Sequence, residues 1–188
     1  MTYLLLYKPF GYLSQFTREV EGQLTLSDLQ IIPEGVYPVG RLDKDSEGLL
    51  LLTDDKKLNH RLLDPRHSHW RTYLVQVEGI PDPKTINKLK KGVKIRINKK
   101  DYTTRPARAR AIDPPEHLPE RNPPVRFRKT VPDSWLEIQL TEGKNRQVRR
   151  MCAKVGYPVL RLLRTRIVDL ELGELQPGEL REINREEL

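Results

Sequence analysis

A cluster of charged side chains directly precedes the most apolar segment of the chain. The cluster reads Gly40-Arg41-Leu42-Asp43-Lys44-Asp45-Ser46-Glu47-Gly48, and four leucines follow it. An apolar run bounded by turn signals predicts a strand that is buried on both faces. Carboxylates held at the start of such a strand are suited to act as nucleophile, base or charged ligand. The alternative is a solvated turn, but Asp43 adjoins a buried strand rather than a free hairpin tip, which favours a functional loop.

The same carboxylates have part of the spacing of a calcium-binding loop. Five residues match EF-hand positions 1, 3, 5, 6 and 12: Asp43, Asp45, Glu47, Gly48 and Asp54. The ninth position, which needs an oxygen ligand, is Leu51, and the twelfth is an aspartate where a bidentate glutamate is usual. Calcium binding is therefore the weaker interpretation.

A second charged group lies on a predicted helix. Apolar residues at helical spacing predict a helix over residues 145–155, with Asn145 as the N-cap. Lys144 and Arg146 stand at its first turn, where cations oppose the helix dipole. A helix N-terminus attracts anions, so added cations there favour a phosphate site over a solvated basic face.

The helical wheel separates the other arginines of this helix. Arg149 lies beside the apolar stripe, whereas Arg146 and Arg150 point away from it. Arg149 is thus placed to reach into a cleft and pair with a buried acid, whereas Arg150 lies on the side of the helix away from the apolar stripe.

Two further groups are weaker candidates. Tyr73 lies in a predicted strand and is by default a half-buried aromatic, which becomes functional only if that strand runs beside Asp43. Arg105, Arg108 and Arg110 alternate along one strand face. This pattern suits a phosphate track, and an exposed sheet edge explains it equally well.

Composition sets the class of protein that these residues serve. The 188 residues carry a net charge of +8, and the pI near 9.6 suits a polyanionic partner such as nucleic acid. Cys152 is the single cysteine, so a disulfide framework is excluded. With no leader sequence at the N-terminus, this predicts a protein of the reducing cytoplasm. No apolar stretch approaches the length of a membrane span.

Short strands outnumber helices, and few helices separate consecutive strands, which predicts an α+β fold with a mainly antiparallel sheet. The predicted strands are residues 3–8, 49–52, 72–78, 93–97, 107–112, 135–141, 159–172 and 179–183. The predicted helices are residues 24–32, a helix capped by Thr53 that ends before Asp64, 82–92 and 145–155.

A long loop interrupts the sheet. Residues 113–133 contain six prolines, which exclude regular structure. Four cations make the loop basic: Arg121, Arg126, Arg128 and Lys129. Loops of this length are usually functional or disordered, and target recognition is one role open to it.

Four segments together carry a resemblance to a known family. The acidic loop and its leucines resemble the signature of the pseudouridine synthases of the RsuA/RluB/RluE/RluF family. Lys8-Pro9-Phe10-Gly11 is similar to the first family motif and Arg71-Thr72-Tyr73 to the second. Gly143-Lys144-Asn145-Arg146-Gln147-Val148-Arg149-Arg150-Met151 is similar to the third. The matches span essentially the whole chain, but the small RNA-binding domain of S4 type that precedes the catalytic domain in most relatives is not expected here.

The resemblance implies the fold and its organisation. We expect the catalytic fold of this family, a mainly antiparallel central sheet in two lobes flanked by helices and loops, with the active-site cleft across the sheet. Residues 1–188 are then a single catalytic domain, with approximate lobes 1–65 and 66–188 and no N-terminal S4 domain.

The resemblance also implies an activity. The enzyme would be an isomerase that converts a uridine of ribosomal RNA, expected in the 23S RNA of the large subunit, to pseudouridine without cofactor or metal. By analogy Asp43 is the catalytic carboxylate, either as nucleophile at the sugar or as base at its 2′ position. Arg149 is its expected charge partner, Tyr73 stacks on the uracil, and Arg41 fills the gap left by the displaced base.

The implied partner is a 23S RNA stem-loop or a ribosomal precursor, bound by a monomer with no membrane association. Six residues are the RNA-binding candidates: Arg41, Lys144, Arg146, Arg150, Arg105 and Arg108. The alternative function is a non-catalytic RNA-binding factor in ribosome assembly, which needs the basic surface but not Asp43.

Overall fold

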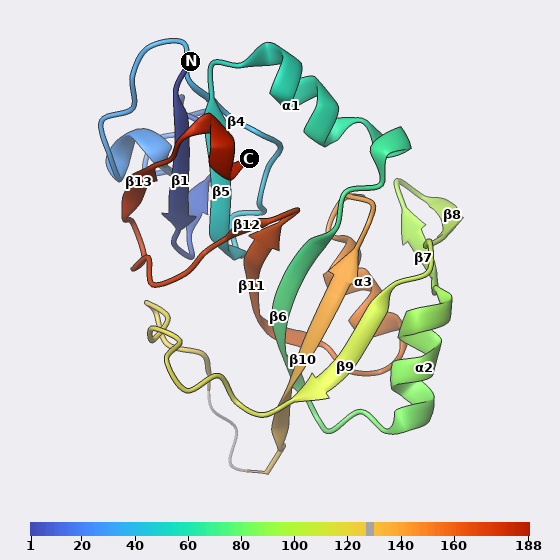
Figure 1. The fold of residues 1–188 in the computed structure, drawn as a ribbon. Coiled ribbons are helices and arrows are strands. Elements are labelled where there is room, and N and C mark those ends of the chain that lie inside the picture. Colours follow the sequence, from blue (N-terminus) through green and yellow to red (C-terminus); the bar gives the residue numbers. More distant parts are fainter. Residues whose placement is uncertain (127–129) are drawn as a thin grey trace.

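A curved sheet runs through the whole molecule (Figure 1). The computed structural model describes residues 1–126 and 130–188, so the predicted loop cations Arg128 and Lys129 lie outside the described residues. In spatial order the main path of the sheet is β13 (Leu180–Glu182), β1 (Tyr3–Lys8), β5 (Glu47–Thr53), β11 (Val159–Ile167), β6 (Arg71–Glu78), β10 (Asp133–Leu140) and β9 (Arg108–Ile112). Along this path all pairings are antiparallel except β5 with β11, which confirms the α+β prediction.

The first half of the sheet comprises β13, β1 and β5, and its strands β1 and β5 are buried on both faces. Leu49 and Leu51 of β5 pack with Leu58 of α1 (Lys56–Leu63) in one apolar cluster. Leu50 and Leu52 belong to a second cluster on the opposite face. The four leucines that follow the acidic loop are therefore completely buried, as predicted, and they anchor that loop to the centre of the molecule.

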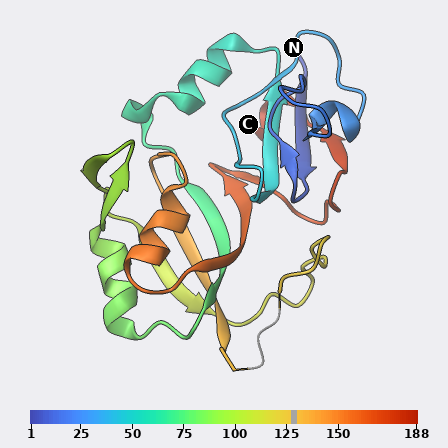
Figure 2. The same cartoon turned by 180° about the vertical axis from the view of Figure 1, so that it is seen from behind.

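The second half of the sheet comprises β11, β6, β10 and β9. It is covered mainly by α3 (Gln147–Lys154) and α2 (Pro83–Lys91). Val148, Met151 and Cys152 of α3 pack against β6 and β10, and Leu89 of α2 joins the same cluster. Figure 2, seen from behind, shows α3 lying across these two strands. No helix in the described part of the chain has the length and apolar run required to cross a bilayer.

The two halves meet at a short junction. The parallel pairing between β5 and β11 comprises only two residue pairs, Leu163 with Glu47 and Arg164 with Gly48. After β11 the chain returns to the first half, where β13 pairs with β1. Glu47 and Arg161 form a bidentate ion pair beside the junction, at 2.7 and 2.9 Å, with side chains only 2% and 7% exposed. This pair and the short pairing position the acidic loop against the second half.

The remaining elements are short. They are β2 (Tyr12–Leu13), β3 (Leu24–Thr25), β4 (Tyr37–Pro38), β7 (Lys94–Ile97), β8 (Lys100–Thr103), β12 (Leu170–Glu171) and the 3-10 turns η1 (Leu26–Asp28), η2 (Pro65–His67) and η3 (Arg185–Glu187). Most of the expected strands and the helix at 82–92 are confirmed within one or two residues. The last long strand is shorter than expected, because β11 ends at Ile167.

Two helix predictions need correction. The helix expected over residues 24–32 is only the 3-10 turn η1, because Leu24 and Thr25 pair with β2 and only a few residues remain before Pro33. The next helix is capped by Asp55 rather than Thr53. The Asp55 carboxylate accepts hydrogen bonds from the backbone N–H groups of Lys57 and Leu58, each at 3.0 Å.

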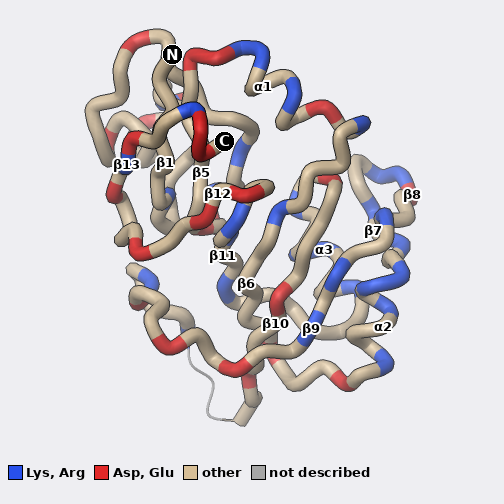
Figure 3. The backbone as a smooth tube through the Cα atoms, in the orientation of Figure 1, with Lys and Arg blue, Asp and Glu red and all other residues tan. Residues whose placement is uncertain are grey.

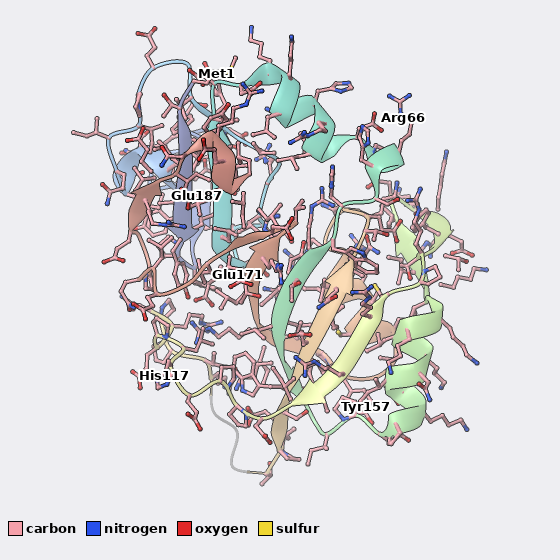
Figure 4. All side chains as sticks on the ribbon, in the orientation of Figure 1. Met1, Arg66, His117, Tyr157, Glu171 and Glu187 are labelled. Carbon is pink, nitrogen blue, oxygen red and sulfur yellow. The ribbon has the colours of Figure 1, made fainter. Side chains whose placement is uncertain are left out.

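The described part of the long loop lies against the first half of the molecule. Arg121 stacks over the ring of Phe10 at 4.3 Å and donates to the carbonyl of Leu160. Arg161 also donates to the Pro119 carbonyl, at 2.8 Å. In Figure 4 the labelled His117 marks where this loop passes below the first half of the sheet. The cation of Arg121 is thus engaged within the protein.

Gly48 allows the close approach at the junction, and its replacement tests that constraint. Its φ is +103°, and an added Cβ would lie 2.2 Å from the carbonyl oxygen of Arg164. We expect Gly48→Ala to lower the free energy of unfolding by about 2 kcal/mol or more, from combined backbone strain and overpacking. Urea unfolding followed by circular dichroism measures the loss.

Gly22→Ala is the matched control, because Gly22 also has a positive φ, +78°, but has open space around its Cβ position. It reports the cost of backbone strain alone. Equal losses in the two variants would show that the contact with Arg164 does not constrain the junction.

Candidate active site

A cleft of about 760 Å³ opens between the two halves of the molecule. Its first wall is the acidic loop, including Arg41 and Asp43, and its second wall is the turn between β10 and α3, including Lys144 and Arg146. Tyr73 of β6 also lines it. The structure therefore brings the signature loop, the second motif and the start of the third motif to one cavity.

Backbone and side-chain contacts from the N-terminal segment hold the acidic loop in place. Ser14 Oγ donates to the Leu42 carbonyl at 2.9 Å and accepts from the Leu42 N–H at 3.0 Å. The N–H of Gly11 donates to the Lys44 carbonyl at 2.8 Å. Asp43 thus lies between two anchored residues, and its position does not depend on a mobile hairpin.

Lys8 is a completely buried cation beneath this loop. Its Nζ donates to the carbonyls of Tyr12 at 2.7 Å, Pro9 at 2.9 Å and Lys44 at 3.5 Å. Burial lowers the pKa of Lys8 to about 7, although the nearby carboxylates of the acidic loop oppose that shift. The ammonium therefore ties three carbonyls together at the base of the cleft.

Asp45 makes a bidentate ion pair with Arg146 across the cleft. Arg146 Nη1 and Nη2 donate to its two carboxylate oxygens at 2.8 and 2.7 Å. Arg149 lies behind it, with Nε 3.4 Å from Asp45 Oδ2, and Nη2 donates to the Asp45 carbonyl at 2.5 Å. Burial alone would raise the pKa of Asp45, but the hydrogen bond from Arg146 and the charges of Arg149 and Arg146 hold that pKa below its usual value.

The direct charge partner expected for Asp43 is not the one that the structure places nearest to it. Arg149 pairs with Asp45, whereas Arg146 approaches Asp43, with 3.8 Å between Nη1 and Oδ2. The wheel that pointed Arg146 away from the cleft assumed a helix from Asn145. That start is wrong, because α3 begins at Gln147 and Arg146 has a left-handed conformation with φ 50°. This turn swings Arg146 toward the acidic loop.

Tyr73 lies beside a buried arginine. Arg164 is the cross-strand neighbour of Tyr73 and also lines the cleft. Its Nε donates to the Leu49 carbonyl at 2.9 Å, and no acidic partner lies within ion-pair distance among the described residues. Burial lowers the pKa of Arg164, although interaction with Tyr73 opposes that shift. The site therefore has a desolvated cation near its aromatic ring.

The RNA-binding candidates divide into two groups. Arg41, Lys144, Arg146 and Arg105 line the cleft. Arg108 lies outside it, stacked over Trp70 at 4.4 Å. Arg150 also lies outside and donates to carbonyls of Asn145 and Arg96.

Sequence reasoning missed two site residues. Asp45 is one of several carboxylates in the loop, and nothing in its sequence neighbours indicates that Arg146 and Arg149, two of the three arginines of the third motif, contact it. The sequence does contain a signal for Arg164. An arginine directly after Leu162 and Leu163 in a predicted strand must either be buried or interrupt the apolar face of that strand.

The calcium-loop spacing has a different structural basis. β5 is extended between the first and last matching residues, so Asp54 lies beyond the opposite end of the strand from Asp43. Asp54 accepts a hydrogen bond from the Thr2 N–H at 2.8 Å. Within residues 1–126 and 130–188, no three potential metal ligands gather around one point.

Comparison with known proteins agrees with this geometry. Residues 2–154 match the model of the RNA pseudouridylate synthase family. The chain belongs to this family. The family expected from the signature loop is therefore confirmed.

Individual relatives cover nearly the whole chain. The chain is 54% identical over 175 residues to a protein of Xanthomonas axonopodis pv. citri named ribosomal large subunit pseudouridine synthase E, covering 93% of this chain and 90% of that protein. Ribosomal large subunit pseudouridine synthase B of Bacillus subtilis is 34% identical, covering 99% of this chain and 69% of that protein.

A solved pseudouridylate synthase has a TM-score of 0.80 at 28% identity and covers 99% of this chain and 71% of its own. This pseudouridine synthase therefore has the expected catalytic fold.

The buried Lys8 predicts a pH dependence of stability. Because its folded pKa of about 7 lies below the unfolded value of 10.5, the unfolded chain binds more protons between these values. The free energy of unfolding contributed by this group should thus rise with pH, by up to about 1.4 kcal/mol per pH unit. Urea unfolding at several pH values from 7 to 9 measures the trend.

Lys8→Met keeps the aliphatic stem and removes the titrating group. Its unfolding free energy should lack this increase, although its absolute stability falls because three carbonyls lose a donor. Parallel pH curves for the two proteins would contradict a Lys8 pKa near neutrality.

The ion pair of Asp45 gives a second prediction. Arg146→Met should raise the pKa of Asp45, since its largest stabilising hydrogen bond is lost while burial remains. The ionised carboxylate stabilises the fold above its unfolded pKa, and this stabilisation is lost as the pH falls through the folded pKa. In Arg146→Met the stabilisation should be smaller. Carbon-detected NMR titration of the aspartate carboxyl groups measures this shift.

Arg150→Met is the control, because Arg150 is a half-buried arginine of the same helix that donates to Asn145 and Arg96 and not to Asp45. An identical Asp45 titration in wild type and Arg146→Met would refute the proposed origin of the low pKa.

Proposed function

We propose that this enzyme converts a uridine of ribosomal RNA, in the 23S RNA of the large subunit, to pseudouridine. The N–C glycosidic bond breaks, the uracil turns, and the base rejoins the ribose through carbon, so no atoms enter or leave. The observation that carries the proposal is the placement of Asp43, Tyr73 and the buried Arg164 around one cleft. Relatives named as large-subunit enzymes support the choice of RNA.

Asp43 is the proposed catalytic carboxylate. It lines the cleft together with Lys44 and Ser46, whereas Asp45 turns toward α3 and is held there by two hydrogen bonds from Arg146. The carboxylate of Asp43 has one long contact, the 3.8 Å approach of Arg146. This single long contact leaves the carboxylate oxygens able to meet the sugar, either at the anomeric carbon or at the 2′ position.

Tyr73 and Arg149 have supporting roles in the proposal. Tyr73 stacks on the displaced uracil, and its buried position beside Arg164 fixes the plane of the ring. Arg149 holds Asp45 and its carbonyl, and through them the loop that carries Asp43. Removing Arg149 would thus displace the loop as well as a nearby positive charge.

The cations at the cleft bind the RNA around the target nucleotide. Arg41 lies on the exposed rim, donates to Gln15 at 2.8 Å, and is placed to occupy the space left by the displaced base. Lys144 and Arg105 lie on the opposite rim and contact phosphates. Arg146 is shared between this role and Asp45.

The broader setting is part of the same proposal. Residues 1–188 form a single catalytic domain, supported by the continuous sheet, and the enzyme acts as a monomer in the cytoplasm, where its RNA is found. In the non-catalytic alternative, the same surface binds RNA during ribosome assembly and Asp43 has no chemical task.

Asp43→Asn separates these two functions. It should reduce pseudouridine formation by at least about 10³-fold, while RNA affinity stays within a few-fold of wild type, because only the reacting oxygen is lost. Pseudouridine in large-subunit RNA is measured by mass spectrometry of nuclease digests, and affinity by filter binding.

The neighbouring Asp45→Asn is the matched control. It weakens the hold of Arg146 and should cost activity only partly, because Asp45 does not line the cleft. Full activity of Asp43→Asn would overturn the catalytic assignment, and complete inactivity of Asp45→Asn alone would move the role to that carboxylate.

A further inference from the structure

The net positive charge of this protein comes from one segment of the chain. Between Lys84 and Arg110 the chain has eleven lysines and arginines and a single acid, Asp101, which gives this segment a net charge of +10. The whole chain carries +8, so the remaining sequence is slightly acidic, with a net charge of −2. The basic character of the protein is thus a property of one region.

All eleven cations are exposed. They come from α2, the β7–β8 hairpin and the first residues of β9 together with the link before it, and these elements lie side by side at one edge of the molecule (Figure 3). We call this surface the basic face. Its elements are contiguous in space, since α2 packs on β9 and β7 pairs with β8.

Few of these charges are used within the protein. Two of them pair with acids, Lys94 with Asp101 at 2.9 Å and Arg110 with Glu137 at 3.0 Å, and no other ion pair of the basic face occurs in the described part of the chain. The dipole of α2 explains lysines in its last turn. It does not explain the cations of the hairpin and β9, where the two ion pairs leave most of the like charges uncompensated.

The basic face is continuous with the cleft. Tyr102 of β8 and Arg105, just before β9, both line the cleft. Arg150 of α3 donates to the Arg96 carbonyl at 2.7 Å and extends the face toward the third motif. An RNA whose target nucleotide occupies the cleft would therefore have its flanking phosphates within reach of the basic face.

The side-chain types of the basic face indicate whether it binds single-stranded or double-stranded RNA. Tyr102 is the only aromatic residue between positions 84 and 110, and it lies at the cleft, with Lys144 Nζ 5.0 Å from its ring centre. Single-stranded RNA is usually bound by stacking bases on aromatic rings, whereas double-stranded RNA is held by its phosphates and ribose. Trp70, a ring next to this face, is covered by the guanidinium of Arg108 at 4.4 Å. Exposed cations with so few free rings suit the latter.

We propose that the basic face binds the phosphate backbone of a double-stranded RNA segment that flanks the target nucleotide. This inference rests on the proposed function, which supplies the RNA in the cleft. The cleft then selects the nucleotide, and the basic face holds the adjoining helix and orients it. Binding through the face should release counterions and depend steeply on salt.

The test compares two double variants with equal charge loss. Lys88→Gln/Lys91→Gln removes two exposed lysines from α2, and Lys56→Gln/Lys57→Gln removes two exposed lysines from the first turn of α1, outside the basic face. Both reduce the net charge equally, and thermal unfolding verifies that both fold. The probe is a blunt RNA duplex of about two turns, which contains no loop for the cleft.

Affinity is measured by fluorescence anisotropy as a function of salt. For Lys88→Gln/Lys91→Gln we expect the slope of log K against log salt to become shallower by about 2, and the slope of the control to stay near that of wild type. A second pair on the hairpin, Arg96→Gln/Lys100→Gln, should behave like the α2 pair. Equal slopes for all variants, or equal reductions in test and control, would overturn the proposal.

A single-stranded RNA of the same length separates the two forms of ligand. Loss of affinity for the single strand without loss for the duplex would also overturn the proposal. Because duplex binding needs no turnover, an inactive wild type would refute the proposed function without deciding the role of the basic face.

Discussion

The ion pair between Asp45 and Arg146 is the interaction on which the geometry of the cleft depends most. It joins the acidic loop of the first half of the sheet to the start of α3 in the second half, residues 101 positions apart in the chain. The strand pairing between these halves, β5 with β11, has only two residue pairs. A junction this short cannot by itself determine how the two walls face each other, so the charged contacts across it do.

Burial makes these contacts effective. The Glu47–Arg161 pair is almost inaccessible to solvent, and such a pair adds little net stability because both ions lose their hydration. The pair instead constrains the geometry of the junction, because burying either charge without its partner would cost free energy. Lys8 has a similar role at the base of the cleft, where its ammonium donates hydrogen bonds to the carbonyls of Pro9, Tyr12 and Lys44. The acidic loop is thus held from below, from behind and from across the cleft.

Charge is also divided between the halves on a larger scale. Asp43 and Asp64 of the first half and Glu142, just after β10, line the cleft, whereas the net positive charge of the chain belongs to α2, the β7–β8 hairpin and β9. In the proposed function, a polyanion approaching the molecule is drawn toward the second half, and the cleft receives the nucleotide at the boundary between the two. The proposed catalytic carboxylate and the cations of the basic face therefore occupy different positions.

The sequence by itself determined the features that depend on local pattern. Alternating or continuous apolar residues specified β1, β5, β6 and β10, and Asp82-Pro83 with Gly92 delimited α2 because capping and proline chemistry act within a few residues. The spacing of the signature loop identified the family and made Asp43 the candidate carboxylate. Only the tertiary structure decided that Arg146 and Arg149 meet Asp45, that α3 begins at Gln147, and that Arg164 is buried beside Tyr73. Each of these depends on contacts between segments far apart in the chain, whose distances and desolvation no local pattern encodes.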